Sequence, residues 1–180
     1  MKYQKQLEQV ASGALSREKL NILRGNAVKK FQQGDDDAKA IIDAIDSNAP
    51  SDSRILFMGF CPGGTFENRL DLKWKEEGIC RFDFPDEKQQ AKFDEICAGD
   101  LVVLKKREII GKTMKVYGHG RVTRVSYDEN DVRYLEMAWA SQDEVIEVPL
   151  LWCNSTVEIR SIEDVEDGMP QEFFDWLAVV

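Results

Sequence analysis

Basic side chains gather in one stretch of an otherwise acidic chain. The formal net charge of −9 disfavours indiscriminate binding to nucleic acid, because such binding relies on Lys and Arg to neutralise phosphates. Residues 101–124 nevertheless hold seven basic side chains and one acidic side chain, Glu108. The seven are Lys105, Lys106, Arg107, Lys112, Lys115, Arg121 and Arg124. This stripe is either a phosphate-contacting surface, which would position a backbone without reading its sequence, or a solvated face of two strands.

Few residues of the chain could act as a nucleophile or bind a metal ion. The chain has one histidine, His119, and four scattered cysteines without a Cys-x-x-Cys pair, so we expect reduced thiols, no metal and no cofactor. Cys61 in "CPGGTF" would need a base to act as a nucleophile, and His119 is the only imidazole available. Gly-x-Ser-x-Gly, P-loop, His-Glu-x-x-His and Gly-x-Gly-x-x-Gly motifs are missing. We therefore predict that the protein is not an enzyme.

The elements that must position these residues fall into two parts. Residues 1–50 read as an N-terminal helical segment, because apolar residues recur at helical spacing, Ser16 is a plausible N-cap, and Gly34 and Pro50 are stop signals. These short amphipathic helices must pack on the rest of the chain or on another copy. From residue 53 to residue 180 the pattern changes to short strands separated by turns, with one early helix at "PDEKQQAKFDEICAG". The sequence thus predicts an α+β protein with a small β-barrel.

Two stretches of the second part raise questions. "CPGGTFENRLDLKWKEEG" reads as a long connection, and Trp74 lies in its polar half, where no core pattern requires an indole. "KVYGHGRVTRV" reads as a strand, although Gly118 and Gly120 flank His119. Such glycines indicate a bulge, or a place where something closely approaches the backbone. Strict alternation would put Lys115, Tyr117, His119, Arg121 and Thr123 on one face, barring a bulge. The closing "PQEFFDWLAVV" fits a short helix or a final strand.

The order of these elements resembles the PUA-like superfamily, and within it the EVE and EVE-like domains. The resemblance covers roughly residues 54–162 and is carried by "KWKEEGI", "FDEICAGDLVVL", "YGHGRVTRVSYDEN" and "YLEMAWA" with Trp139. It implies a compact barrel flanked by helices, with a cleft able to hold a flipped nucleobase. EVE-like domains of this kind often accompany methylation-dependent restriction systems, which read modified DNA bases, and the related YTH domains read a methylated adenine in RNA.

A base-holding cleft requires flat rings for stacking and polar groups for reading the base edge. Trp74 is the leading stacking candidate, ahead of Phe60 and Phe66, whereas Trp139 and Trp152 fit the core better. Backbone groups of "FMGFCPGG" are candidates for edge reading, as are Asn68, Asp71 and Arg81. The predicted base-binding set is therefore Trp74, Phe60, Phe66, Asn68, Asp71 and Arg81, and the predicted phosphate-binding set is the seven basic residues above.

Two functions remain open on the sequence alone. The first is a non-catalytic module that reads a modified, flipped base in DNA or RNA, in phage defence or nucleic-acid regulation. The alternative is a structural or protein-interaction module that self-associates through its N-terminal helices, which the net charge favours. The N-terminus lacks the apolar core of a signal peptide and no run is long enough to span a membrane, so we expect a cytoplasmic protein with no membrane partner.

Overall fold

A mixed β-sheet organises the chain after its N-terminal helices. The computed structural model describes residues 2–47, 54–141 and 144–179. Within them, one seven-stranded sheet has the order β2-β5-β4-β3-β1-β7, with β6 paired to β4. The strands are β1 (Arg54–Gly59), β2 (Ile79–Arg81), β3 (Leu101–Ile109), β4 (Thr113–Tyr127), β5 (Arg133–Trp139), β6 (Ile146–Pro149) and β7 (Val157–Ser161). Among these seven strands, only β1 and β3 pair in parallel. The predicted α+β class is confirmed; the sheet is open between β2 and β7, so a closed barrel is not shown.

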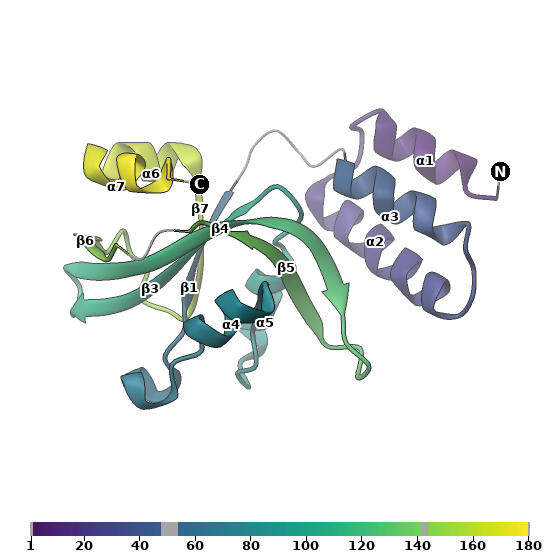
Figure 1. The fold of residues 1–180 in the computed structure, drawn as a ribbon. Helices are drawn as coiled ribbons and strands as arrows, with labels where there is room; N and C mark the ends of the chain where they lie inside the picture. The colour runs from purple at the N-terminus through teal and green to yellow at the C-terminus, as the bar shows by residue number, and fades with distance from the viewer. Residues whose placement is uncertain (1, 48–53, 142–143, 180) are drawn as a thin grey trace.

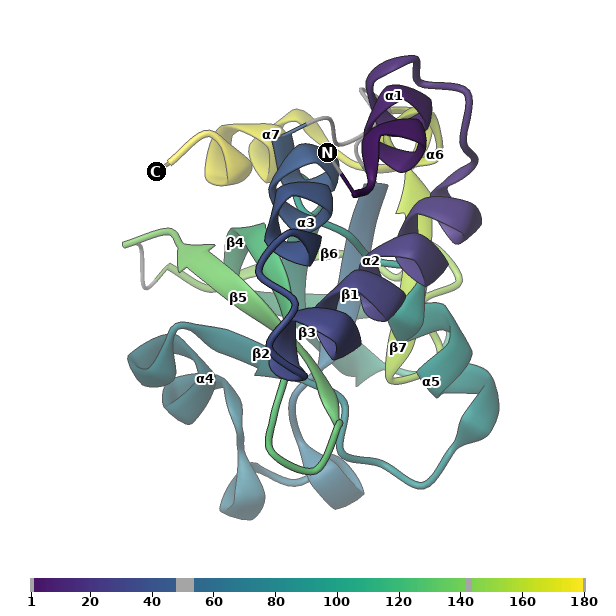
Figure 2. The ribbon, with the colours of Figure 1, turned by 90° about the vertical axis from the view of Figure 1, so that its right-hand side faces the viewer.

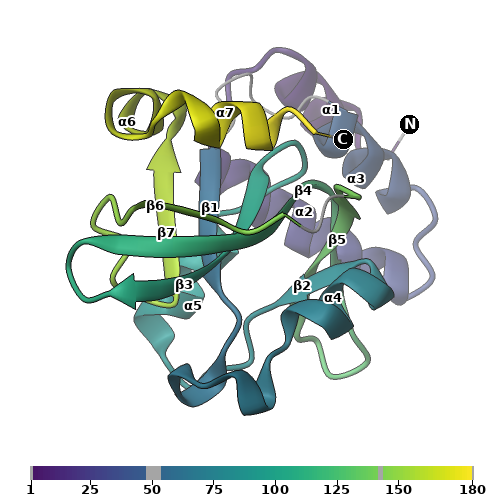
Figure 3. The same cartoon turned by 60° about the vertical axis from the view of Figure 1, so that its left-hand side comes forward.

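Helices cover both faces of this sheet (Figures 1 and 3). The helices α4 (Asp71–Glu77) and α5 (Glu87–Asp94) lie on one face, and α6 (Ile162–Gly168) and α7 (Gln171–Leu177) on the other. Because side chains alternate along a strand, β1 sends Leu56 and Met58 into the first core and Ile55 and Phe57 into the second. Two short 3₁₀ turns, η1 (Pro62–Gly64) and η2 (Phe66–Asn68), connect β1 to α4.

The N-terminal helices form a small core of their own. Helices α1 (Gln4–Ala11), α2 (Arg17–Gln32) and α3 (Ala38–Ser47) bury residues such as Val10, Ala27 and Ile41 against one another, and they stand together in Figure 2. The predicted N-cap is confirmed, because the Ser16 hydroxyl accepts a hydrogen bond from the backbone N–H of Lys19. Pro50 lies outside the described residues. None of the helices in the described part of the chain is long and apolar enough to cross a membrane.

Close approach by the chain itself explains the glycines around His119. A Cβ at Gly118 would lie 2.6 Å from Cε of Lys75, and one at Gly120 would lie 2.6 Å from the carbonyl oxygen of Ala138. The strand also carries register shifts opposite Leu104–Lys105 and between Val122 and Arg124. The stated exception of a bulge therefore applies to β4, because each bulge moves the following side chains to the opposite face.

Candidate functional site

Trp74 is a core residue, which corrects its predicted role as a base-stacking surface. The stretch that reads as a connection contains α4, and this helix turns Trp74 into the first core, where the side chain is 2% exposed. Its backbone carbonyl accepts a hydrogen bond from the indole N–H of Trp139 at 3.1 Å. The left-handed Gly78 ends the helix. A ring sealed in this way cannot stack on a ligand unless the core opens.

The other predicted base-binding residues do not form one open site: Phe60, Phe66 and Asp71 gather around Arg69, whereas Arg81 lies apart on β2. Phe60 is fully buried, and Asp71 is 1% exposed in a bidentate pair with Arg69, at 2.8 and 2.5 Å. Arg81 lies on β2 and pairs with Asp128 and Asp83. These three side chains are therefore committed to the protein. Two others, Phe66 (45% exposed) and Asn68, remain open to solvent in the η2 turn.

A cluster of three rings around one guanidinium lies beside this turn. Phe60, Phe66 and Tyr117 contact one another with ring centroids 5.0–6.4 Å apart, and Arg69 lies 5.4–5.9 Å from all three. The Lys106 ammonium lies 5.0 Å from the centroid of the Phe66 ring. These cation–π contacts fix the η2 turn against β3 and β4. The sequence analysis did not predict a role for Arg69, although its position two residues before Asp71 indicates that the two side chains can form an ion pair.

One cavity contains none of the predicted site residues. It has a volume of about 940 Å³ and lies between α2, α5 and the β4–β5 hairpin. Its cations are largely committed to protein acceptors. Arg133 donates to the carbonyls of Phe93 and Ile96, and Arg54 pairs with Glu95 at 3.0 Å.

Strand order creates the second cavity, of about 360 Å³, at one edge of the sheet. Because β1 and β3 run parallel, the end of β1 at Gly59 lies opposite Lys105. The antiparallel β7 begins at the same edge, where the N–H of Gly59 donates to the carbonyl of Thr156 at 2.7 Å. The turn after β1, the second half of β3 and the loop before β7 therefore meet. We call this cavity the glycine-turn pocket, and define it by residues 59–61, 63–64, 105–108 and 154–156 together with Phe84 and Ile110.

The turn after β1 opens toward this pocket. Gly63 and Gly64 have φ of 72° and 78°, values that glycine adopts without strain. A Cβ at either position would find no atom within 4 Å, so a ligand has room to approach the backbone here. The prediction that "FMGFCPGG" contributes backbone groups to a site is thus compatible with the geometry. Phe84 adds a half-buried ring to the lining.

Three predicted phosphate-binding residues line the pocket: Lys105, Lys106 and Arg107. Lys105 is 4% exposed, and its ammonium donates to the carbonyls of Cys153 and Ser155 at 2.8 and 2.6 Å. Burial lowers the pKa of Lys105 from 10.5 to about 8. An ammonium has three N–H donors, so one donor remains beyond these two bonds. Arg107 is exposed.

The remaining four predicted phosphate-binding residues do not line the pocket. Arg121 pairs with Leu101 at the opposite end of β3 and donates to the Gly99 carbonyl at 2.7 Å. Arg124 pairs with Glu136 at 3.5 Å, and Lys115 with Glu108 at 3.4 Å. Lys112 is exposed at the β3–β4 turn. The basic stripe is thus divided between the pocket and other parts of the sheet, because β4 returns antiparallel to β3.

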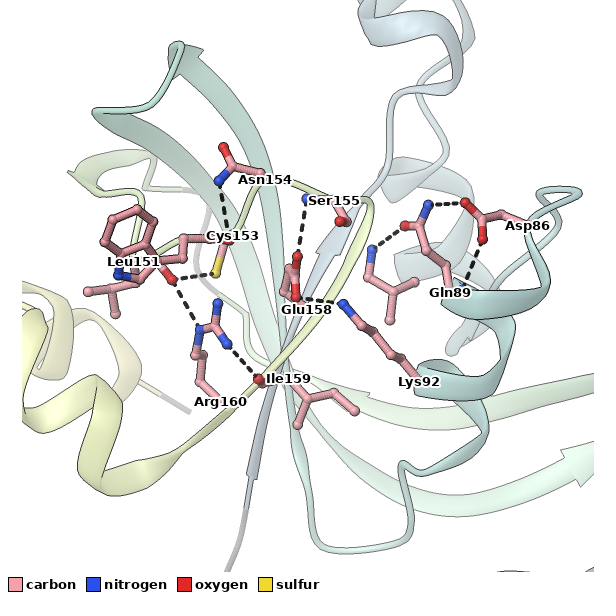
Figure 4. A network of polar contacts seen from close by, with 12 residues as sticks. Asp86, Gln89, Lys92, Leu151, Cys153, Asn154, Ser155, Glu158, Ile159 and Arg160 are labelled. Atoms are coloured by element: carbon pink, nitrogen blue, oxygen red, sulfur yellow. Dashed lines mark hydrogen bonds and ion pairs between the residues drawn. The ribbon is translucent and has the colours of Figure 1, made fainter.

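Polar contacts hold the pocket wall in front of β7 (Figure 4). Glu158 accepts from the Ser155 N–H at 3.3 Å and pairs with Lys92 of α5 at 2.9 Å. The side chain of Gln89 accepts from the Val157 N–H at 2.9 Å. These bonds join α5 to the start of β7, so the wall is positioned by a helix rather than by its own short loop.

Cys61 and His119 are not brought together. Cys61 lines the glycine-turn pocket beside the first core. His119 instead packs against Trp176 of the second core, with the two rings tilted at 33° and their centroids 4.7 Å apart, and it donates from Nε2 to the Leu177 carbonyl. Burial, reinforced by Asp71, raises the pKa of the Cys61 thiol. A thiolate nucleophile with His119 as its base is inconsistent with this arrangement. The described residues contain no group of three or more His, Cys, Asp or Glu placed to hold a metal ion.

Comparisons of the chain with protein-family models, with curated proteins and with solved structures give no match.

Proposed function

We propose that this chain is a non-catalytic nucleic-acid-binding protein that holds one nucleotide in the glycine-turn pocket. The observation that carries the proposal is the meeting of Lys105, Lys106 and Arg107 with the Gly63–Gly64 turn at one cavity. Lys, Arg and backbone N–H groups are the usual partners of phosphate oxygens. The pocket is also within the size range of small-molecule sites, which is roughly 300–1,000 Å³.

Aromatic rings near the pocket suit the base of such a nucleotide. Phe84 contributes a flat ring to the lining, and Phe66 is exposed under the Lys106 ammonium. The likeness to EVE domains supports three more specific proposals. The bound base is modified and flipped out of DNA or RNA, the sheet is related to the PUA-like barrel, and the protein acts in the cytoplasm beside a restriction system.

The test compares two double variants that remove equal charge. Short fluorescein-labelled single strands carrying cytosine, 5-methylcytosine, 5-hydroxymethylcytosine or N6-methyladenine are titrated by anisotropy at several salt concentrations. Lys106→Ala/Arg107→Ala should weaken binding at least tenfold and reduce the slope of log K against log salt by about 1.4, since each lost single-strand phosphate contact removes about 0.7. Arg121→Ala/Arg124→Ala, away from the pocket, should change neither. Equal losses in both variants would mean that net charge, and not the pocket, determines binding.

Self-association through the N-terminal helices is the alternative, and one observation favours it. Helix α2 leaves Ile22 and Phe31 58% and 39% exposed. Sedimentation velocity of wild type and Phe31→Ser decides this case. A dimer that Phe31→Ser dissociates, in a protein that binds none of the strands above, would replace the nucleic-acid proposal with this alternative.

A further inference from the structure

A strained turn presents the most exposed aromatic ring among the described residues. Leu151 and Trp152, between β6 and β7, have φ of 45° and 61°, and such left-handed angles are unfavourable for bulky side chains. Trp152 is nevertheless 82% exposed, so its indole adds little to the core in return. Strained backbone of this kind persists where the surroundings enforce it, and it gathers at functional sites.

Several contacts enforce the strained conformation. The Cys153 N–H donates to the Leu150 carbonyl at 2.8 Å, and Nε of Arg160 donates to the Leu151 carbonyl at 3.0 Å, the second of which is drawn in Figure 4. The ammonium of Lys105 holds the Cys153 carbonyl. The Leu151 side chain packs so tightly on α6 that a Cβ at Gly168 would lie 2.3 Å from it. Because these contacts come from β7, β3 and α6, the tertiary structure itself holds the indole exposed.

The turn adjoins the glycine-turn pocket on two sides. The Leu150 N–H donates to the Lys112 carbonyl at 3.0 Å, which joins the turn to the β3–β4 hairpin tip, where Ile110 lines the pocket. On the other side the chain continues directly into Asn154, which also lines the pocket. The exposed cations Arg107 and Lys112 lie on this hairpin. An indole beside a cationic pocket suits a base followed by phosphates.

We propose that Trp152 stacks on the base next to the nucleotide held in the pocket, so that the protein binds a single strand rather than an isolated nucleotide. This inference rests on the function proposed above. Base–aromatic stacking tolerates every base, because each base has a flat π-face. The pocket would then discriminate between bases, and Trp152 would add affinity without sequence preference. The exposed cations Arg107 and Lys112 favour a nucleic-acid strand on the hairpin side of the turn, whereas the charged side chains of α6, on its other side, are acidic.

The experiment separates this inference from the proposed function by the length of the probe. Deoxycytidine monophosphate and a single-stranded deoxycytidine trinucleotide are titrated against wild type, Trp152→Ala and Trp152→Phe. Loss of one stacked base should weaken trinucleotide binding about 5- to 150-fold in Trp152→Ala and leave monophosphate binding unchanged. Trp152→Phe should recover part of the loss. The tryptophan fluorescence of the wild type should fall when the trinucleotide binds, because a base can stack on the exposed indole of Trp152.

Each other outcome has a defined meaning. Suppose that Trp152→Ala leaves trinucleotide affinity unchanged, while Lys106→Ala/Arg107→Ala still lowers it at least tenfold. This result would overturn the stacking role of Trp152 and leave the proposed pocket in place. Equal weakening of both probes would show that Trp152 only shapes the pocket, which also overturns it. Binding of neither probe by wild type, together with no binding of the modified strands titrated above, would remove the proposed function and the stacking with it. Trp152-dependent dimers in sedimentation, without strand binding, would identify the indole as a protein contact instead.

Discussion

Replacing His119 by Gln should remove a large acid-dependent loss of stability. Burial, with a smaller contribution from the Lys75 ammonium, lowers the pKa of His119 from 6.5 to about 4. Above pH 6.5 the imidazole is neutral in both states. As the pH falls from 6.5 to 4, only the unfolded chain binds the proton, so unfolding becomes more favourable. The two pKa values give a loss of about 2 kcal/mol between pH 8 and pH 5, approaching about 3 kcal/mol below pH 4.

Urea unfolding, followed by circular dichroism at several pH values, measures this difference. Gln does not titrate and keeps a donor for the Leu177 carbonyl, and His119 is the only histidine in the chain. Carboxylates titrate in both proteins and cancel. The wild type should therefore lose about 2 kcal/mol relative to His119→Gln between pH 8 and pH 5. A difference that stays constant would mean that the imidazole titrates normally, and that it is not sealed against Trp176.

Three further predictions follow from the packing of single residues. Gly120→Ala should lower the free energy of unfolding by about 1–3 kcal/mol, because the new Cβ meets the backbone of Ala138. Gly118→Ala should lower it by less, since the end of the Lys75 side chain can move away. Equal losses of stability in the two variants would contradict this reasoning. Between pH 7 and pH 10 the free energy of unfolding of the wild type should rise by about 2.5 kcal/mol relative to that of Lys105→Met. The reason is that the buried ammonium loses its proton near pH 8, whereas the unfolded chain keeps it to about pH 10.5. Parallel pH profiles of the two proteins would exclude the lowered pKa. Trp74→Ala should destabilise the fold by about 3–5 kcal/mol in urea titrations, whereas loss of strand binding at unchanged stability would restore Trp74 as a ligand-contacting residue.

Local patterns predicted the elements well where one signal dominated. Ser16 before an amphipathic run marked the start of α2, and alternating or continuous apolar runs marked the strands. The pattern failed for α4, because the proline and glycines after Cys61 dominated the reading of the whole stretch to Gly78. Within it, Leu70 and Trp74 have helical spacing, and Gly78 is a typical helix end. Applying the helical period from Leu70 onward would have predicted both the helix and the buried indole.

The two tryptophans with reversed roles show why the site itself needs the fold. Trp74 lies among charged residues and is buried, whereas Trp152 follows "VPLL" and is exposed. Neighbouring residues indicate the average exposure of a segment, but the direction of one side chain depends on which segments arrive beside it. Helix α4 packs on the sheet and closes over Trp74. At Trp152 two left-handed residues, fixed by contacts from β3, β7 and α6, turn the indole outward.

The glycine-turn pocket depends on topology in the same way. Gly63, Lys105 and Ser155 are 42 and 50 residues apart in sequence, and nothing in their local patterns relates them. They meet because β1 and β3 are parallel neighbours and β7 returns antiparallel on the other side of β1. The same topology sends Arg121 to the far end of β3, although in sequence it lies close to the basic residues that line the pocket. Phosphate binding should therefore follow position at the sheet edge and not membership of the basic stripe, which is why the Arg121→Ala/Arg124→Ala control discriminates between the two.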